Sequence, residues 1–195
     1  MDVYGLELKR GQLSSSSIWV THSGDGSKSS YNSVIAGWHI HQERYGDYRP
    51  HHFILIGRQS YSEIILLNLN SDQWQDKKGG DWWVYYGFNS VPTGVGYYPK
   101  SLFTSMAENA NQIKLGAFAG TDRTVPSPPI GSGALRNSGQ LGRVASFTNL
   151  CLVGQDERNN PITGDLPSVV SNNQCYSVTP VAHGACFCGG PGGCM

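Results

Sequence analysis

Apolar and polar residues alternate along short runs of this chain, and turn-forming residues separate the runs. The run at residues 33–41 shows this pattern and ends before a turn at 46–50. Its β-branched and aromatic bulk comes from Val34, Ile35, Trp38 and Ile40. Residues of this kind favour a strand, so residues 33–41 are predicted to form one.

The same reasoning predicts strands along most of the chain. Further strands are expected at residues 15–21, 52–57, 61–70 and 144–153. A turn at 77–81 predicts a hairpin that joins residues 61–76 to residues 82–88. Residues 121–143 and the tail from 155 are expected to be mostly loops and extended pieces.

Only one segment has the three- and four-residue spacing that is typical of a helix. It follows Pro99, which a first helical turn tolerates. The residues at this spacing are Leu102, Phe103, Met106, Ala107, Ala110 and Ile113. One short helix over about 99–113 is therefore expected. Alternating strands with a single helix predict an all-β fold, an antiparallel β-sandwich of two stacked sheets.

Composition agrees with a single domain over residues 1–195 that is built from short strands. The chain has 25 Gly and 10 Pro, which suits many turns, and its 14 basic and 14 acidic residues give no net charge. Because no basic stripe exists, nucleic acid and anionic membrane are not expected as partners. No apolar run is long enough to span a membrane, and residues 1–7 lack the features of a secretory signal.

A series of short motifs follows a definite order along the chain. The motifs are Tyr4-Gly5, Ile18-Trp19-Val20, Ala36-Gly37-Trp38, Tyr45-Gly46-Asp47, Trp74 with Asp76, Gly80 with Trp82-Trp83, Gly96-Tyr97-Tyr98-Pro99, Leu102-Phe103, Pro129-Ile130-Gly131-Ser132-Gly133, Ala145-Ser146-Phe147, Cys175-Tyr176 and Gly189-Gly190-Pro191-Gly192-Gly193-Cys194. In this order they resemble the neprosin family, which are plant prolyl endopeptidases of the glutamic peptidase class. The resemblance implies a β-sandwich, a proline-containing peptide or protein as substrate or ligand, no cofactor, and secretion.

The resemblance also implies two catalytic glutamates. One activates water as a general base, and the other polarises the scissile carbonyl. The first is expected just before the Ala-Gly-Trp motif, where this chain has Ile35. The second is expected in the strand after the helix, where Phe118 occupies the matching position. Neither side chain can accept a proton or donate a hydrogen bond, so no catalytic residue is assigned and an inactive homologue is expected.

Other acids are candidates to replace these glutamates. They are Glu43, Asp47, Glu63, Asp76, Asp81, Glu108 and Asp122. Most of them lie in turns or outside the expected strands, so the favoured interpretation is that they are solvated or turn-capping carboxylates.

The chain is also shorter than the family between Phe53 and Trp74, which are separated by only 20 residues. Family members have a longer stretch there, with additional strands and a disulfide loop. The domain is therefore expected to lack part of the family's sheet, either through divergence or because the chain is a truncated or exon-skipped version. Losing those strands would expose sheet edges.

The chain has five cysteines, which are Cys151, Cys175, Cys186, Cys188 and Cys194. By the resemblance, Cys175 and Cys194 are expected to form a disulfide, and an odd count leaves at least one free thiol or an intermolecular bridge. The tail cysteines with His183, and His39 with His41, are ligand types for a metal. The disulfide and a polar outer strand face are the favoured interpretations, so no metal site is expected.

Three aromatic residues, Trp38, Tyr97 and Tyr98, are candidates to line a binding groove, because flat rings suit proline or glycan. Adjacent strand residues face opposite ways, so only one of each neighbouring pair can be in the core. Three functions remain open. They are an inactive homologue that binds a proline-containing peptide, an endopeptidase that works at acid pH with other acids, and a structural domain that binds cell-wall carbohydrate or peptide.

Overall fold

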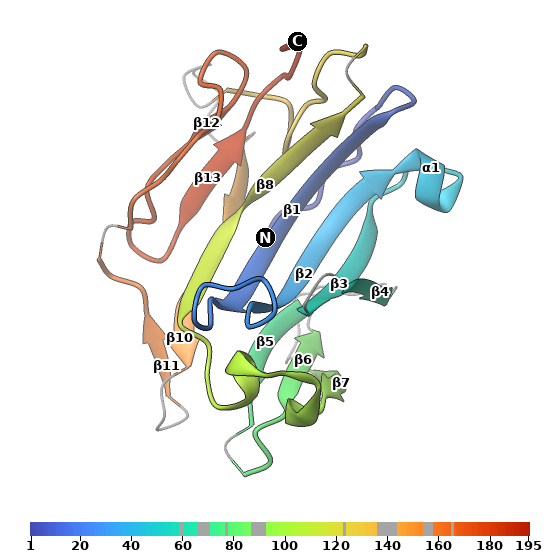
Figure 1. Ribbon diagram of the computed structural model, residues 1–195. Coiled ribbons are helices and arrows are strands. Elements are labelled where there is room, and N and C mark those ends of the chain that lie inside the picture. Colours follow the sequence, from blue (N-terminus) through green and yellow to red (C-terminus); the bar gives the residue numbers. More distant parts are fainter. Residues whose placement is uncertain are drawn as a thin grey trace. The chain divides into compact units, whose positions relative to one another are not determined.

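The structure, a computed structural model, describes residues 1–58, 61–65, 71–76, 78–86, 93–122, 124–135, 144–153, 158–164 and 166–195 (Figure 1). Strands dominate the fold, as the sequence predicts. The strands are β1 (Gln12–His22), β2 (Asn32–His41), β3 (His51–Arg58), β4 (Tyr61–Ile65), β5 (Ser71–Gln75), β6 (Trp82–Tyr86), β7 (Thr93–Tyr98), β8 (Gln112–Thr121), β9 (Ala145–Phe147), β10 (Cys151–Val153), β11 (Asn159–Pro161), β12 (Ser177–Val178) and β13 (Cys186–Gly189). The short helical pieces are α1 (Gln42–Tyr45), η1 (Lys100–Leu102) and η2 (Ser105–Ala107).

In the described part of the chain the strands form four sheets, which confirms the all-β prediction. The largest has the order β4-β3-β2-β1-β8, and the others have the orders β5-β6-β7, β12-β13-β9 and β10-β11. The hairpin predicted around the turn at 77–81 is present only next to the turn, because β5 pairs antiparallel with β6 and places Gln75 opposite Trp82. The first part of the predicted arm is β4, which pairs with β3 instead. The strand predicted at 61–70 is β4 over its first five residues, and residues 66–70 lie outside the described residues.

The chain divides into two compact units. Unit 1 contains Met1–Ser16, His39–Pro50 and Gly116–Met195, and unit 2 contains Ser17–Trp38 and His51–Leu115. The expectation of one domain with a shortened sheet between Phe53 and Trp74 stays a prediction.

Unit 2 contains a hydrophobic core with side chains from two sheets. Its buried members are Val20, Val34, Ala36, Ile54, Ile56, Trp82, Val84, Tyr98, Phe103 and Met106. In β2, alternation decides which side chains enter the core, because Val34 and Ala36 are buried while Ile35 between them is only partly buried. Each fully buried large side chain contributes roughly 1.5–3 kcal/mol to folding, so this core holds the inner faces of the two sheets together.

The helix expected over 99–113 is not continuous. The structure has the two 3₁₀ turns η1 and η2 there, and β8 already begins at Gln112. Hydrogen bonds such as Phe103 N–H to the Lys100 carbonyl, at 3.0 Å, span three residues rather than four. Phe103 and Met106 reach the core, whereas Leu102 and Ile113 are exposed. The apolar spacing therefore reflects two short turns, with Met106 buried in η2 and Phe103 buried directly after η1.

Two further elements differ from the prediction. The single strand expected at 144–153 is divided into β9 and β10, and Asn149 between them has a φ of 55°. Asparagine tolerates this left-handed conformation, which interrupts an extended strand. The short helix α1 follows β2 directly and was not predicted; it ends at Gly46, whose φ is 76°.

Unit 1 contains the β12-β13-β9 sheet and a small buried cluster. Cys186 and Cys188 on β13 are opposite Phe147 and Ala145 on β9, and all four side chains are buried. The N-terminal segment joins this sheet, because Asp2 N–H donates to the Ser146 carbonyl at 3.0 Å. Within the described part of the chain, no helix is long and apolar enough to cross a membrane.

Candidate functional site

The first position expected to carry a catalytic acid is Ile35, in the middle of β2 in unit 2. It faces away from the core that Val34 and Ala36 enter, and it is partly buried. Ser33, two residues earlier on the same face, is 2% exposed. The strand therefore presents a side chain at this position on the face opposite the core, but that side chain is a hydrocarbon.

The second position is Phe118 on β8, in unit 1, and its side chain is 54% exposed. Its backbone carbonyl accepts a hydrogen bond of 3.5 Å from the Ser15 hydroxyl. The ring leans along the strand, because a Cβ added at Gly120 would be 3.0 Å from Phe118 Cε1 and 3.5 Å from the Leu13 Cβ. An aromatic ring thus lies on the open face of the strand where an acid is expected.

The candidate replacement acids perform structural roles or are exposed. Asp47 Oδ1 accepts the Arg49 N–H at 3.0 Å, Asp76 Oδ2 accepts the Gly79 N–H at 2.6 Å, and Asp81 Oδ1 accepts the Lys100 N–H at 3.0 Å. Glu43 is exposed and lies 4.0 Å from the Arg10 guanidinium, an exposed pair of little energetic weight.

The last three candidate replacement acids do not form a buried pair of carboxylates among the described residues. Glu108 and Asp122 are exposed, and the side chain of Glu63 lies outside the described part of the structure. The interpretation of solvated and turn-capping carboxylates therefore agrees with the contacts of the described acids.

The histidines of β2 lie in unit 1 and contact the helix that follows. His39 is 6% exposed, and its Nε2 forms a short hydrogen bond with the Tyr45 hydroxyl of α1. The rings of His39 and His41 meet edge to face with centroids 6.2 Å apart. Burial raises the pKa of Tyr45. The expected polar outer face is in fact partly buried here, because α1 supplies a partner that strand periodicity alone does not reveal.

The three candidate groove aromatics have different environments. Trp38 is 0% exposed and Tyr98 is 9% exposed, so neither can line a groove in this structure, and the core accounts for both. Tyr97 is 52% exposed and remains accessible. This outcome follows from alternation, because neighbouring strand residues face opposite sides of a sheet.

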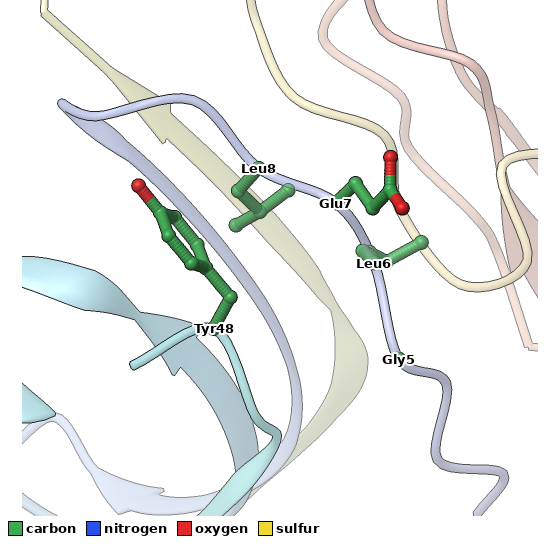
Figure 2. Close-up of a pocket in the computed structure, with 5 residues that line it drawn as sticks. All are labelled: Gly5, Leu6, Glu7, Leu8 and Tyr48. Carbon is green, nitrogen blue, oxygen red and sulfur yellow. The ribbon is translucent and has the colours of Figure 1, made fainter. Parts of the chain in front are cut away.

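A pocket of about 470 Å³ in unit 1 was not predicted (Figure 2). It is lined by Gly5, Leu6, Glu7, Leu8 and Tyr48. Figure 2 shows the Tyr48 ring beside Leu8, while the Glu7 carboxylate points away from that ring. The lining thus offers mainly apolar surface and one carboxylate, which does not make the close carboxyl pair that glutamic peptidase chemistry requires.

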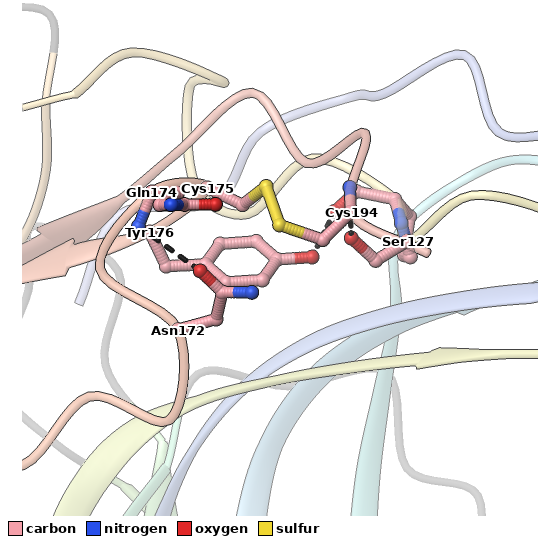
Figure 3. The surroundings of a disulfide bond; sticks show 7 residues. Ser127, Asn172, Gln174, Cys175, Tyr176 and Cys194 are labelled. Atoms are coloured by element: carbon pink, nitrogen blue, oxygen red, sulfur yellow. Dashed lines mark hydrogen bonds between the residues drawn. A yellow bond between two sulfur atoms is a disulfide. The ribbon is translucent and has the colours of Figure 1, made fainter.

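The C-terminal tail is fixed by a disulfide between Cys175 and Cys194, the pairing that the family resemblance implies (Figure 3). The Cα atoms are 6.1 Å apart, and the two cysteines lie 19 positions apart in the sequence. Ser127 strengthens the attachment, since its N–H donates to the Cys194 carbonyl at 2.8 Å and its hydroxyl accepts the Cys194 N–H at 3.1 Å. Tyr176 donates to the Pro128 carbonyl at 2.8 Å.

The remaining cysteines are free thiols in different surroundings. Cys151 is exposed, whereas Cys186 and Cys188 are buried. Burial raises the pKa of the Cys188 thiol to about 12, and Cys186 and Asp2 add to the shift. Cys194 is in the disulfide, so it cannot serve as a thiolate ligand beside Cys186, Cys188 and His183 in the tail. Among the described residues, no group of three or more metal-ligating side chains gathers in one place.

Comparison with known proteins identifies one matching family. A family model described as Neprosin matches residues 10–71 and 67–191, which together cover most of the chain. Ile35 lies in the first matched segment and Phe118 in the second. The two segments meet at residues 67–71, within the stretch between Phe53 and Trp74 where the sequence is shorter than expected.

Proposed function

Because this chain belongs to the neprosin family, we propose that it is a peptidase homologue that binds a proline-containing peptide without cleaving it. The observation that carries the proposal is the pair of apolar residues, Ile35 and Phe118, at the two positions expected to hold glutamate. Each lies on a strand of the kind the family uses to present its acids, so the scaffold is retained while the reactive groups are replaced.

The chemistry explains why two such replacements matter more than one. A water molecule needs a base to become a nucleophile, and the carbonyl oxygen needs a donor as negative charge develops on it. Isoleucine and phenylalanine supply neither function. The described replacement acids are solvent-exposed or hold turn N–H groups, and this supports the view that no second carboxyl pair has taken over.

The proposal also places the protein outside the reducing cytosol. The Cys175–Cys194 disulfide supports this, because such bonds persist mainly in oxidising compartments. A mass measurement of the protein from its natural source, without reductant, is expected to find these two cysteines linked. A reduced pair in the native protein would contradict extracellular residence.

The test for catalysis compares four preparations on a proline-containing peptide at about pH 4–5, where one carboxyl of a close pair stays protonated. These are the wild type, Ile35→Glu with Phe118→Glu, the matched Ile35→Gln with Phe118→Gln control, and a mock purification. The wild type is expected to equal the mock, and only the glutamate pair is expected to cleave. The glutamine pair has the same size and polarity but cannot accept the proton.

Two results would contradict the proposal. Wild-type cleavage above the mock would show an active endopeptidase that uses other acids. A folded glutamate pair without activity would show that the two positions are wrongly assigned or that the groove is lost. Calorimetric titration of the wild type with the same peptide tests whether the protein binds it. The absence of binding heat would refute the proposed peptide binding.

A further inference from the structure

Three aromatic rings gather on one face of the β5-β6-β7 sheet in unit 2. Trp83 and Tyr85 come from β6, and Tyr97 comes from β7. The Trp83 and Tyr97 rings stack with centroids 5.0 Å apart and an interplanar angle of 30°. The Trp83 and Tyr85 rings are 6.0 Å apart and tilted by 40°. We call these three residues the aromatic patch.

The patch is on the side of the sheet that is opposite the core. Trp82 and Tyr98, which are 5% and 9% exposed, pair with each other and belong to the core. Trp83 and Tyr97 are the next pair along and therefore face outward. Tyr97 is 52% exposed, so the stacked pair keeps surface that a ligand can reach.

A bulge leaves the surface beside the rings without a side chain. The register shifts between Val84 and Tyr85, which places Gly94 opposite Tyr85. A Cβ at Gly94 would lie 3.4 Å from the Trp83 ring and 3.5 Å from the Tyr85 ring. Glycine at this position therefore leaves the flanks of the two rings uncovered.

Charge restricts the class of ligand. Neither β6 (WWVYY) nor β7 (TGVGYY) contains a charged residue. Nucleic acids stack on aromatic rings as well, but their sites also need a positively charged groove. The strands that carry the aromatic patch offer none, so an uncharged ligand complements this surface best.

Ring geometry separates the two uncharged candidates. Proline-rich peptides insert their rings into grooves between aromatic side chains. The Trp83 and Tyr97 rings already cover each other, with centroids 5.0 Å apart, so no slot remains between them. A sugar in the pyranose form instead presents a flat face of C–H groups and stacks on an outer ring face, while tyrosine hydroxyls and an indole N–H bond its hydroxyl groups.

We propose that the aromatic patch of Trp83, Tyr85 and Tyr97 binds a neutral oligosaccharide, with pyranose rings stacked on the exposed aromatic faces. This site goes beyond the peptide-binding function proposed above, because it takes a different class of ligand. An interpretation without a ligand also exists, since cross-strand aromatic pairs stabilise sheets on their own. The two interpretations differ in what they expect of the exposed Tyr97.

Affinity electrophoresis in native gels that contain hydroxyethyl cellulose, a neutral soluble β-glucan, distinguishes them. The wild type is expected to be retarded, and cellohexaose is expected to release it. Tyr97→Ala should weaken retardation about tenfold or more, because a stacked ring contributes that much to binding. Tyr97→Phe keeps the ring and should retain most of the retardation. The matched control is Tyr31→Ala, which removes a tyrosine that is 39% exposed and lies outside the aromatic patch.

Thermal unfolding of each variant separates loss of binding from loss of folding. A Tyr97→Ala protein that melts with the wild type but migrates freely supports the sugar site. The proposal is overturned if the wild type is not retarded, if Tyr97→Ala is retarded as strongly as the wild type, or if Tyr31→Ala loses retardation equally. It is also overturned if a polyproline peptide, but not cellohexaose, protects the tryptophan fluorescence of the protein from quenching by acrylamide. None of these results depends on peptide cleavage.

Discussion

The side-chain oxygen of Asn32 accepts the backbone N–H of Thr104 at 2.9 Å, joining the start of β2 to the segment that contains η1 and η2. The same oxygen accepts the Thr104 hydroxyl at 3.0 Å and the Met106 N–H at 3.1 Å. Asn32 is 0% exposed. One buried amide therefore positions the turn that delivers Phe103 and Met106 into the core of unit 2.

Replacing Asn32 with alanine is expected to destabilise the protein by about 2–4 kcal/mol, because buried donors lose their acceptor and each costs roughly 1–3 kcal/mol. Denaturant unfolding measures the change. Asn109→Ala, at an exposed position in the following segment, is the matched control and should stay within about 0.5 kcal/mol of the wild type. Equal losses in both variants would show that Asn32 has no special role.

The Asn32 contacts also explain which parts of the fold the sequence could predict. The apolar and β-branched residues of β1, β2 and β3 predict these strands, and in β2 the core residues Val34 and Ala36 recur at every second position. The helix expected at 99–113 does not form, since the N–H groups of Thr104 and Met106 bond to a side chain 72 and 74 residues away. No local pattern reveals a partner that is so distant in the chain.

The candidate site was also only partly predictable from the sequence. The order of the motifs predicts the disulfide partners correctly, because motif positions do not depend on packing. The assignment of Ile35 and Phe118 to the glutamate positions rests on the same order and stays a prediction. The burial of Trp38 and Tyr98 beside the exposure of Tyr97 required strand register as well. The Trp83–Tyr97 stack depends on the register between β6 and β7, and the His39–Tyr45 contact depends on the unpredicted α1. In each case the two residues lie on different elements, so the spacing within one strand does not reveal the contact.

Reduction of the Cys175–Cys194 disulfide is expected to lower stability by about 3 kcal/mol, because the bond closes a loop whose ends are 19 residues apart. A double Cys175→Ser and Cys194→Ser variant should melt at a lower temperature and become insensitive to reductant. Cys151→Ser provides the control, since this thiol is exposed and free. It should melt like the wild type and remain sensitive to reductant. A double variant that melts unchanged would mean that Ser127 and Tyr176 hold the tail without the bond.

The side chain of Phe118 is 54% exposed, whereas that of Phe147 in the same unit is 2% exposed. Phe147→Ala is expected to cost about 3–5 kcal/mol, because it leaves a cavity beside β13. Phe118→Ala should change stability by no more than about 0.5 kcal/mol, since the ring is mostly in solvent. Denaturant unfolding of the two single variants measures both values. A loss of several kcal/mol at Phe118 would mean that this ring is part of a core, and that glutamate at this position would disturb folding before it could restore chemistry.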